Sequence, residues 1–195
     1  MAKADPKQQR NERNRNTRWV ITIFVITILV SAAISLISEE VMAGSGIVAA
    51  FFILMIIVLV GILFDIIGVA VTSADEKPFH SMAARKVPGA KEAIRLLHNA
   101  ERVSSICNDV VGDICGVVSG AAAASIAAQV LHHFTFSWPR LITLIMSALV
   151  AGVTVGGKAM GKTVAINSNT KIVHWVGKVI YYMTHIPQIR KKKKK

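Results

Sequence analysis

Cysteine is scarce in this sequence. The two cysteines, Cys107 and Cys115, lie eight residues apart in one apolar stretch. On a helix, this spacing separates them by about 12 Å at about 1.5 Å per residue, which is too far for a disulfide bond between them. No combination of Cys and His at metal-site spacing occurs. The sequence therefore predicts two buried free thiols and no disulfide-stabilised fold.

Charged side chains are also few and unevenly placed. They make up 17% of the chain, while 53% of the residues are hydrophobic, above the roughly 45–50% of soluble domains. Of the 23 Lys and Arg residues, 18 cluster beside apolar runs, at 3–18, 77–102 and 190–195. These clusters lack the interleaved aromatic side chains and the soluble domain expected of a nucleic-acid-binding protein, so no nucleic-acid partner is expected. They are typical of the flanks of membrane helices.

Four apolar runs are long enough to cross a bilayer, which takes about 20 residues. They predict transmembrane helices at 19–37, 47–71, 103–131 and 141–157. The amphipathic segments at about 74–102 and 170–184 predict short helices lying at the cytosolic face. A basic segment at 1–18 and a polybasic tail at 186–195 complete the chain. The predicted fold class is an all-α integral membrane protein, with the lipid bilayer as its first partner.

The distribution of Lys and Arg predicts the orientation in the membrane. Six lie before the first span and six between the second and third, whereas the two opposite loops hold none and one, Arg140. Because basic loops stay on the cytosolic side, we expect both termini in the cytosol and a plasma-membrane location.

Small side chains recur every four residues along the third span, at Gly112, Gly116, Gly120, Ala124 and Ala128. Rows of this kind let the backbones of two membrane helices approach closely. The sequence therefore predicts that this row is a helix-packing face.

Residues 156–163, GGKAMGKT, match the phosphate-loop pattern GxxxxGK[ST] letter for letter. That pattern binds nucleotide when a strand delivers the loop and a helix receives it, but here it follows a span-length apolar run. No pairing of a nucleophile with a base is apparent either. We therefore expect neither nucleotide hydrolysis nor any other enzymatic activity.

Ionisable groups inside the predicted spans need an explanation, because each Asp there costs roughly 2.5–3.5 kcal/mol on insertion scales. Asp109 and Asp113 lie four residues apart on one helix face, and with Asn108 they could supply oxygen ligands to Mg²⁺. Asp65 and Lys158 lie at similar depth in the second and fourth spans. Alternatively, Lys158 neutralises one or two of the acids in a buried ion pair. The residues leave both alternatives open.

Three stretches carry a resemblance to a known family. Residues 64–68 (FDIIG) look like an FSGSE-type helix end, residues 89–97 (GAKEAIRLL) with Glu101 and Arg102 like G-A-x-x-A-x-x-L-L and P-E-R, and residues 157–165 (GKAMGKTVA) like G-E-I-x-P-K-T-x-A. In this order, residues 47–185 resemble the transmembrane domain of the CNNM/CorC family of Mg²⁺ transport proteins. The first span lies outside the resemblance, and no stretch of these 195 residues resembles the family's tandem regulatory domains.

The resemblance implies Mg²⁺ as the transported ion and a homodimer as the assembly. It implies metal ligands at Asp65, where the family has a Ser, and at Asp113, with Asn108 and Asp109 as competitors. Lys158 departs from the pattern because it stands where the family has an acidic Glu. An internal counter-ion at Lys158 would instead make the chain a transport-incompetent scaffold or regulator with a regulatory partner protein, which is the second hypothesis.

Overall fold

The computed structural model of the chain describes residues 6–43, 46–133 and 138–192. Throughout this part of the chain the regular structure is helical, without strands. Its helices contain four segments long and apolar enough to cross a membrane: Thr17–Ser38, Ile47–Ser73, Ala100–His133 and Pro139–Asn167. The predicted all-α integral membrane architecture is confirmed.

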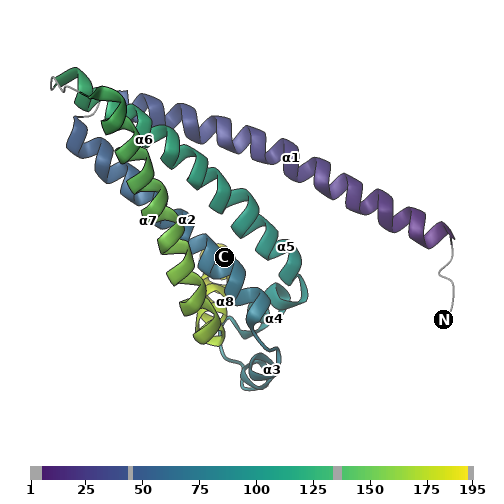
Figure 1. The fold of residues 1–195 in the computed structure, drawn as a ribbon. Coiled ribbons are helices and arrows are strands. Elements are labelled where there is room, and N and C mark those ends of the chain that lie inside the picture. The colour runs from purple at the N-terminus through teal and green to yellow at the C-terminus, as the bar shows by residue number, and fades with distance from the viewer. Residues whose placement is uncertain (1–5, 44–45, 134–137, 193–195) are drawn as a thin grey trace.

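The helices follow one another with short connections. In chain order they are α1 (Pro6–Ala43), α2 (Ile47–Ser73), α3 (Lys77–Ala84), α4 (Ala90–His98), α5 (Ala100–Ser104), the π-helix η1 (Ser105–Gly112), α6 (Asp113–His133), α7 (Pro139–Asn167) and α8 (Asn169–Lys192). Figure 1 shows α2, α6 and α7 bundled together, with α1 alongside α6 at one end and spreading away from it toward the N-terminus. The third predicted span, 103–131, is therefore built by α5, η1 and α6 in succession.

The amphipathic pieces gather at one end of the bundle, which we call the basic end: α3, α4 and the start of α8, next to the C-terminal end of α2. Pro78 occupies the first turn of α3, where its missing N–H leaves no hydrogen bond unmade. Gly89 precedes α4 with φ of 85°, a left-handed conformation that favours glycine. A side chain at Gly89 would also meet the backbone of Lys178 on α8. The basic end therefore needs glycine at position 89 for two reasons, its left-handed backbone conformation and its close approach to α8.

Three apolar clusters hold the bundle together. The first lies between α2 and α6, the second joins α2, α3, α4, α7 and α8 at the basic end, and the third joins α6 and η1 to α1. Their buried members are Ala50, Leu54, Val58, Ala122, Ala123 and Ile126; then Ala70, Val71, Phe79, Ala93, Leu97, Ala165 and Val173; then Val110, Ile114 and Val118. Cys107 and Cys115 are both buried and free, which confirms the prediction for the thiols.

The prediction that the small-residue row of the third span packs against another helix is wrong for most of the row in the described structure. Gly112 is buried, but Gly120, Ala124 and Ala128 are exposed, and a side chain at Gly116 or Gly120 would meet nothing within 4 Å. A four-residue step advances about 40° beyond a full turn of a 3.6-residue helix. Each successive residue of the row, from Gly112 toward Ala128, is therefore rotated further away from α2. The buried residues Cys115, Ser119, Ala122 and Ile126 instead follow alternating steps of four, three and four residues, which keeps them on one side of the helix.

Candidate cation site between α2, η1 and α7

Asp65 lies on the face of α2 that packs against η1 and α6. It shares this face with Gly61 and Gly68, at one-turn spacing, and is only 5% exposed. A side chain at Gly112 would overlap the carboxylate oxygen Oδ1 of Asp65. The missing side chain of Gly112 therefore makes the space into which the Asp65 carboxylate fits.

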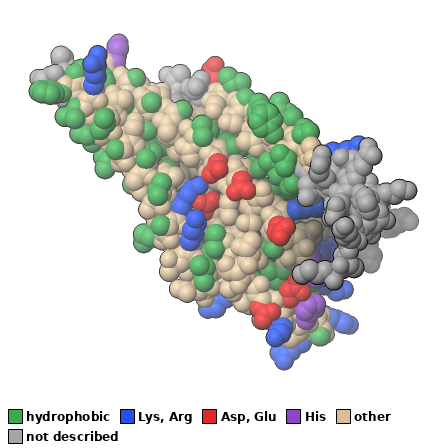
Figure 2. All heavy atoms as spheres, turned by 45° about the vertical axis from the view of Figure 1, so that its right-hand side comes forward, with side chains coloured by type: hydrophobic (Ala, Val, Ile, Leu, Met, Phe, Trp, Pro, Cys, Tyr) green, Lys and Arg blue, Asp and Glu red, His purple; other side chains and the backbone are tan. Residues whose placement is uncertain are grey.

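Lys158 reaches this carboxylate from α7. Its Nζ lies 3.1 Å from Oδ2 of Asp65 and 3.9 Å from Oδ1 of Asp113. It also donates a hydrogen bond of 3.2 Å to the carbonyl oxygen of Gly112. One ammonium group thus faces two carboxylates and one carbonyl. Figure 2 shows acidic and basic side chains side by side on a face of the bundle, away from its ends.

Close packing of α7 against α2 brings the Lys158 side chain within reach of Asp65 and the Gly112 carbonyl. Gly157 and Gly161 lie directly against the side chains of Ile62 and Ile66 on α2, and a Cβ at either glycine would overlap them. The residues of the phosphate-loop-like pattern, 156–163, are helical throughout. The glycines of this pattern therefore serve helix packing, and the backbone there does not form a phosphate-binding loop.

The π-helix η1 supplies the third side of the site. At its end the N–H of Asp113 bonds to the carbonyl of Asn108, five residues earlier. Such wide turns occur frequently at functional sites. Gly112, the last residue of η1, accepts the hydrogen bond from Lys158, so the main chain as well as side chains contributes oxygen to the site.

The other two predicted ligands lie apart from Lys158. Asn108 packs against Gly68, one turn along α2 from Asp65. Its Nδ2 donates to Oγ of Ser104 at 3.1 Å, while its buried Oδ1 has no hydrogen-bond partner in the described structure. Asp109 is exposed and accepts a 2.8 Å hydrogen bond from Oγ of Ser105. The structure therefore brings together Asp65 and Asp113, with Asn108 adjacent and Asp109 outside.

The donor set of this cluster is oxygen-rich and carries a net negative charge. Two carboxylates and one ammonium sum to one negative charge (−2 + 1 = −1). Oxygen donors of this kind suit hard cations such as Mg²⁺. In the described ranges, no three or more His, Cys, Asp and Glu side chains are grouped closely enough to hold a metal ion on their own. A cation at this cluster would therefore also need the Gly112 carbonyl, Asn108 or water.

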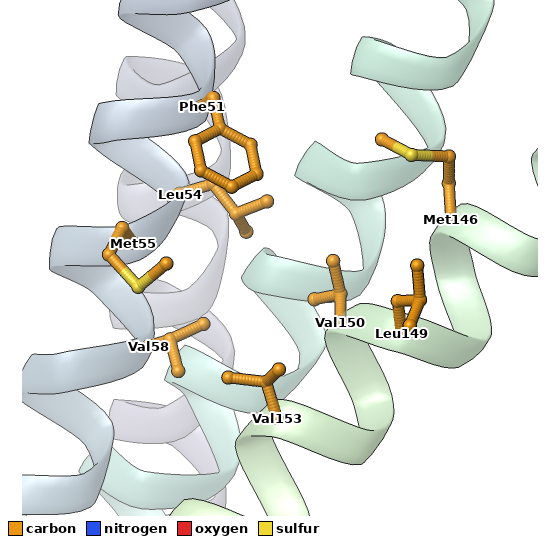
Figure 3. Close-up of a pocket in the computed structure, with 8 residues that line it drawn as sticks. All are labelled: Phe51, Leu54, Met55, Val58, Met146, Leu149, Val150 and Val153. Carbon is orange, nitrogen blue, oxygen red and sulfur yellow. The ribbon is translucent and has the colours of Figure 1, made fainter.

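An apolar groove lies between α2 and α7, on the side of the cluster away from the basic end. It has a volume of about 260 Å³ and is lined by Phe51, Leu54, Met55, Val58, Met146, Leu149, Val150 and Val153. Figure 3 shows these side chains projecting from the two helices into the space between them. None of the lining side chains has an oxygen or nitrogen ligand. The polar cluster is thus bounded by an apolar region on this side.

Sequence reasoning found the charged groups of the site and missed its glycines. Gly61 and Gly68 flank Asp65 on one helix face, and this spacing around an intramembrane acid is the signal that a second helix approaches there. The role of the Gly112 carbonyl had no signal in the sequence. No protein-family model, curated protein or solved structure matches the chain.

Proposed function

We propose that this protein binds and transports a divalent cation, Mg²⁺, at the cluster of Asp65, Gly112 and Asp113. The observation that carries the proposal is the surroundings of Lys158 Nζ, which has three oxygen atoms of these residues within 3.9 Å. The ammonium group of Lys158 therefore lies at the point where a metal cation would be bound by the same oxygen atoms. The resemblance of residues 47–185 to the CNNM/CorC transmembrane domain supports Mg²⁺ as the ion.

Lys158 has a defined part in this proposal, as a tethered competitor. When the ion enters, electrostatic repulsion moves the flexible ammonium away, and both carboxylates turn to the divalent cation. Mg²⁺ usually keeps several of its waters, so two carboxylates and one carbonyl suffice as protein ligands. The neighbouring Oδ1 of Asn108 is available to accept a hydrogen bond from such a water. Return of Lys158 then helps to release the ion.

One observation favours a second function, that of a transport-incompetent scaffold or regulator. The direct ion pair of Lys158 with Asp65 fills the cluster, and the apolar groove offers no ligands beyond it. In this case the ion pair replaces a transported cation permanently, and the protein acts by binding a regulatory partner.

The orientation and the assembly belong to the same proposal. The Lys/Arg distribution supports an orientation with both termini in the cytosol, and we propose the plasma membrane as the location. For the homodimer, the support is the exposed small-residue face of α6, where Gly120, Ala124 and Ala128 leave room for another helix backbone. Cysteine cross-linking of Ala124→Cys, in a chain lacking Cys107 and Cys115, tests this contact. Absence of a cross-linked dimer in membranes would count against it.

Mg²⁺ flux into proteoliposomes tests the function. The samples are the wild-type chain, the Asp65→Ala/Asp113→Ala variant, Lys158→Gln, and the control Asp75→Ala, which removes an exposed acid outside the cluster. Transport predicts flux in wild type and in the control, and loss of flux in the double variant. The scaffold function predicts no flux in wild type or in Lys158→Gln. Equal flux in wild type and the double variant would exclude the cluster as the transport site.

A further inference from the structure

Helix α8 has two apolar faces, and the bundle covers only one of them. On the inner face, Val173 is fully buried and Gly177 packs directly against the backbone of Gly89 and Ala93. On the outer face, large side chains recur at intervals of four, three and one residues and are exposed: Trp175 (65%), Val179, Tyr182 and Met183 (69%). This spacing places them on one side of the helix, so a large apolar surface remains without a partner among the described residues of the chain.

Positive charge borders this outer face. Lys171 and Lys178 are both exposed and lie four residues before Trp175 and Tyr182, respectively, so each is next to an aromatic ring along the helix surface. The two lysines are seven residues apart and therefore form one edge of the face. The sequence continues with six more cations at 190–195. An aromatic and aliphatic surface edged by lysines matches a lipid headgroup layer, where aromatic rings and cations both find partners.

The placement of α8 agrees with this environment. Only Ser168 separates it from α7, and Asn169 Nδ2 at its start donates a 2.9 Å hydrogen bond to the carbonyl of Ser73, the last residue of α2. Figure 1 shows α8 nearly along its own axis, beside the lower part of α7, whereas α2 and α7 run across the view. A helix that lies crosswise at the end of membrane-spanning helices lies along the plane of the bilayer surface.

We propose that the outer face of α8 lies in the headgroup layer of the membrane and binds anionic phospholipid. Trp175 and Tyr182 place their rings at the level of the ester groups, while Val179 and Met183 reach toward the acyl chains. Lys171 and Lys178 contact the phosphate groups of anionic lipids. The proposal concerns a surface separate from the Asp65 cluster and stands independently of the proposed transport.

Fluorescence of the full-length chain in lipid nanodiscs tests the depth of this face. In the Trp19→Phe/Trp138→Phe variant, Trp175 is the sole tryptophan. We expect brominated phospholipids to quench its emission and iodide to leave it unaffected. The control is the same chain with Tyr182→Ser and Met183→Ser added. These substitutions weaken the apolar face, so iodide is expected to reach Trp175 and quench its emission. Strong iodide quenching of Trp175 before this change overturns the proposal and indicates a face that meets water or a protein partner.

The preference for anionic lipid is measured separately. Competition between phosphatidylglycerol and phosphatidylcholine for the protein surface is followed with spin-labelled lipids, in wild type and in Lys171→Gln/Lys178→Gln. Each cation near an anionic surface contributes about 1 kcal/mol, so removal of both lowers the preference by up to about thirty-fold. The control Lys162→Gln removes an exposed lysine of α7 and is expected to change it little. An unchanged preference in the α8 variant overturns the assignment of anionic lipid.

Discussion

Lys158 and Asp65 form an ion pair between α7 and α2, with 3.1 Å between Nζ and Oδ2, in a part of the bundle where Asp65 is almost fully buried. Each of these charges would be unfavourable in this place without the other. The pair is therefore both one of the contacts between the two helices and the group that a transported cation would have to displace.

Removal of one partner should cost more stability than removal of both. Asp65→Asn leaves Lys158 with only Asp113 and the Gly112 carbonyl, and we expect a loss of about 2 kcal/mol in unfolding free energy, below the roughly 3–5 kcal/mol of fully buried pairs. In Asp65→Asn/Lys158→Met no unpaired charge remains, so most of this loss should be recovered. Unfolding in detergent, analysed as a double-mutant cycle, gives the coupling energy. Additive effects of the two substitutions would contradict a direct pair.

Removal of the Lys158 charge should strengthen Mg²⁺ binding. In Lys158→Gln the charge of the cluster changes from −1 to −2, and a divalent ion no longer competes with an ammonium group. We expect at least about tenfold tighter binding, equivalent to about 1.4 kcal/mol, measured as the Mg²⁺-dependent rise in unfolding temperature. Lys162→Gln, one turn further along α7, is the matched control and should bind Mg²⁺ as wild type does. Equal gains in both variants would point to a general surface effect.

Glycines at the contact between α2 and η1 should not tolerate a methyl group. A Cβ at Gly68 would lie 2.7 Å from Cγ of Asn108, so Gly68→Ala should cost about 1–3 kcal/mol through overpacking. Gly152→Ala adds the same methyl at an exposed position of α7, where nothing lies within 4 Å, and should cost nothing. Thermal unfolding of the two variants compares them directly. A similar loss in both would contradict a cost specific to the contact between α2 and η1.

Trp19 should hold α1 to the rest of the chain through Arg102. The guanidinium carbon of Arg102 lies 5.3 Å from the centre of the Trp19 ring, a cation–π geometry worth about 0.5–2 kcal/mol. Trp19→Ala and Arg102→Ala should therefore each lower stability and show coupling when combined. Phe24→Ala removes a ring of α1 that is 66% exposed and serves as the control. If Arg102→Ala is as costly in the Trp19→Ala background as in wild type, the contact contributes nothing.

The orientation is open to a labelling experiment in cells. In a chain with Cys107→Ala and Cys115→Ala, single cysteines at Gly46 and Ser168 report on opposite ends of the bundle, before α2 and after α7. We expect a membrane-impermeant maleimide to label Gly46→Cys on intact cells and Ser168→Cys only after lysis. The reverse pattern would place the basic end outside the cell.

The membrane architecture could be read from the sequence because each spanning helix satisfies a local condition, about 20 apolar residues in succession. The charged residues of the site were equally visible, since Asp65, Asp113 and Lys158 interrupt such runs. Their pairing was left as one of two alternatives, because contact between distant helices depends on how each is rotated about its axis. For α6 that rotation misled the prediction: Gly112 meets α2, but Ala124 and Ala128 have turned away.

The π-helix between Ser105 and Gly112 holds the chain in a register that an ordinary α-helix would not keep. Tightening that wide turn into α-helical geometry would advance the helix by one residue, which corresponds to a rotation of about 100°. The Gly112 carbonyl would then swing away from Lys158, and Asn108 would leave Gly68. The wide turn is therefore what holds the backbone oxygen of Gly112 and the side chain of Asn108 at the positions they have beside α2 and α7.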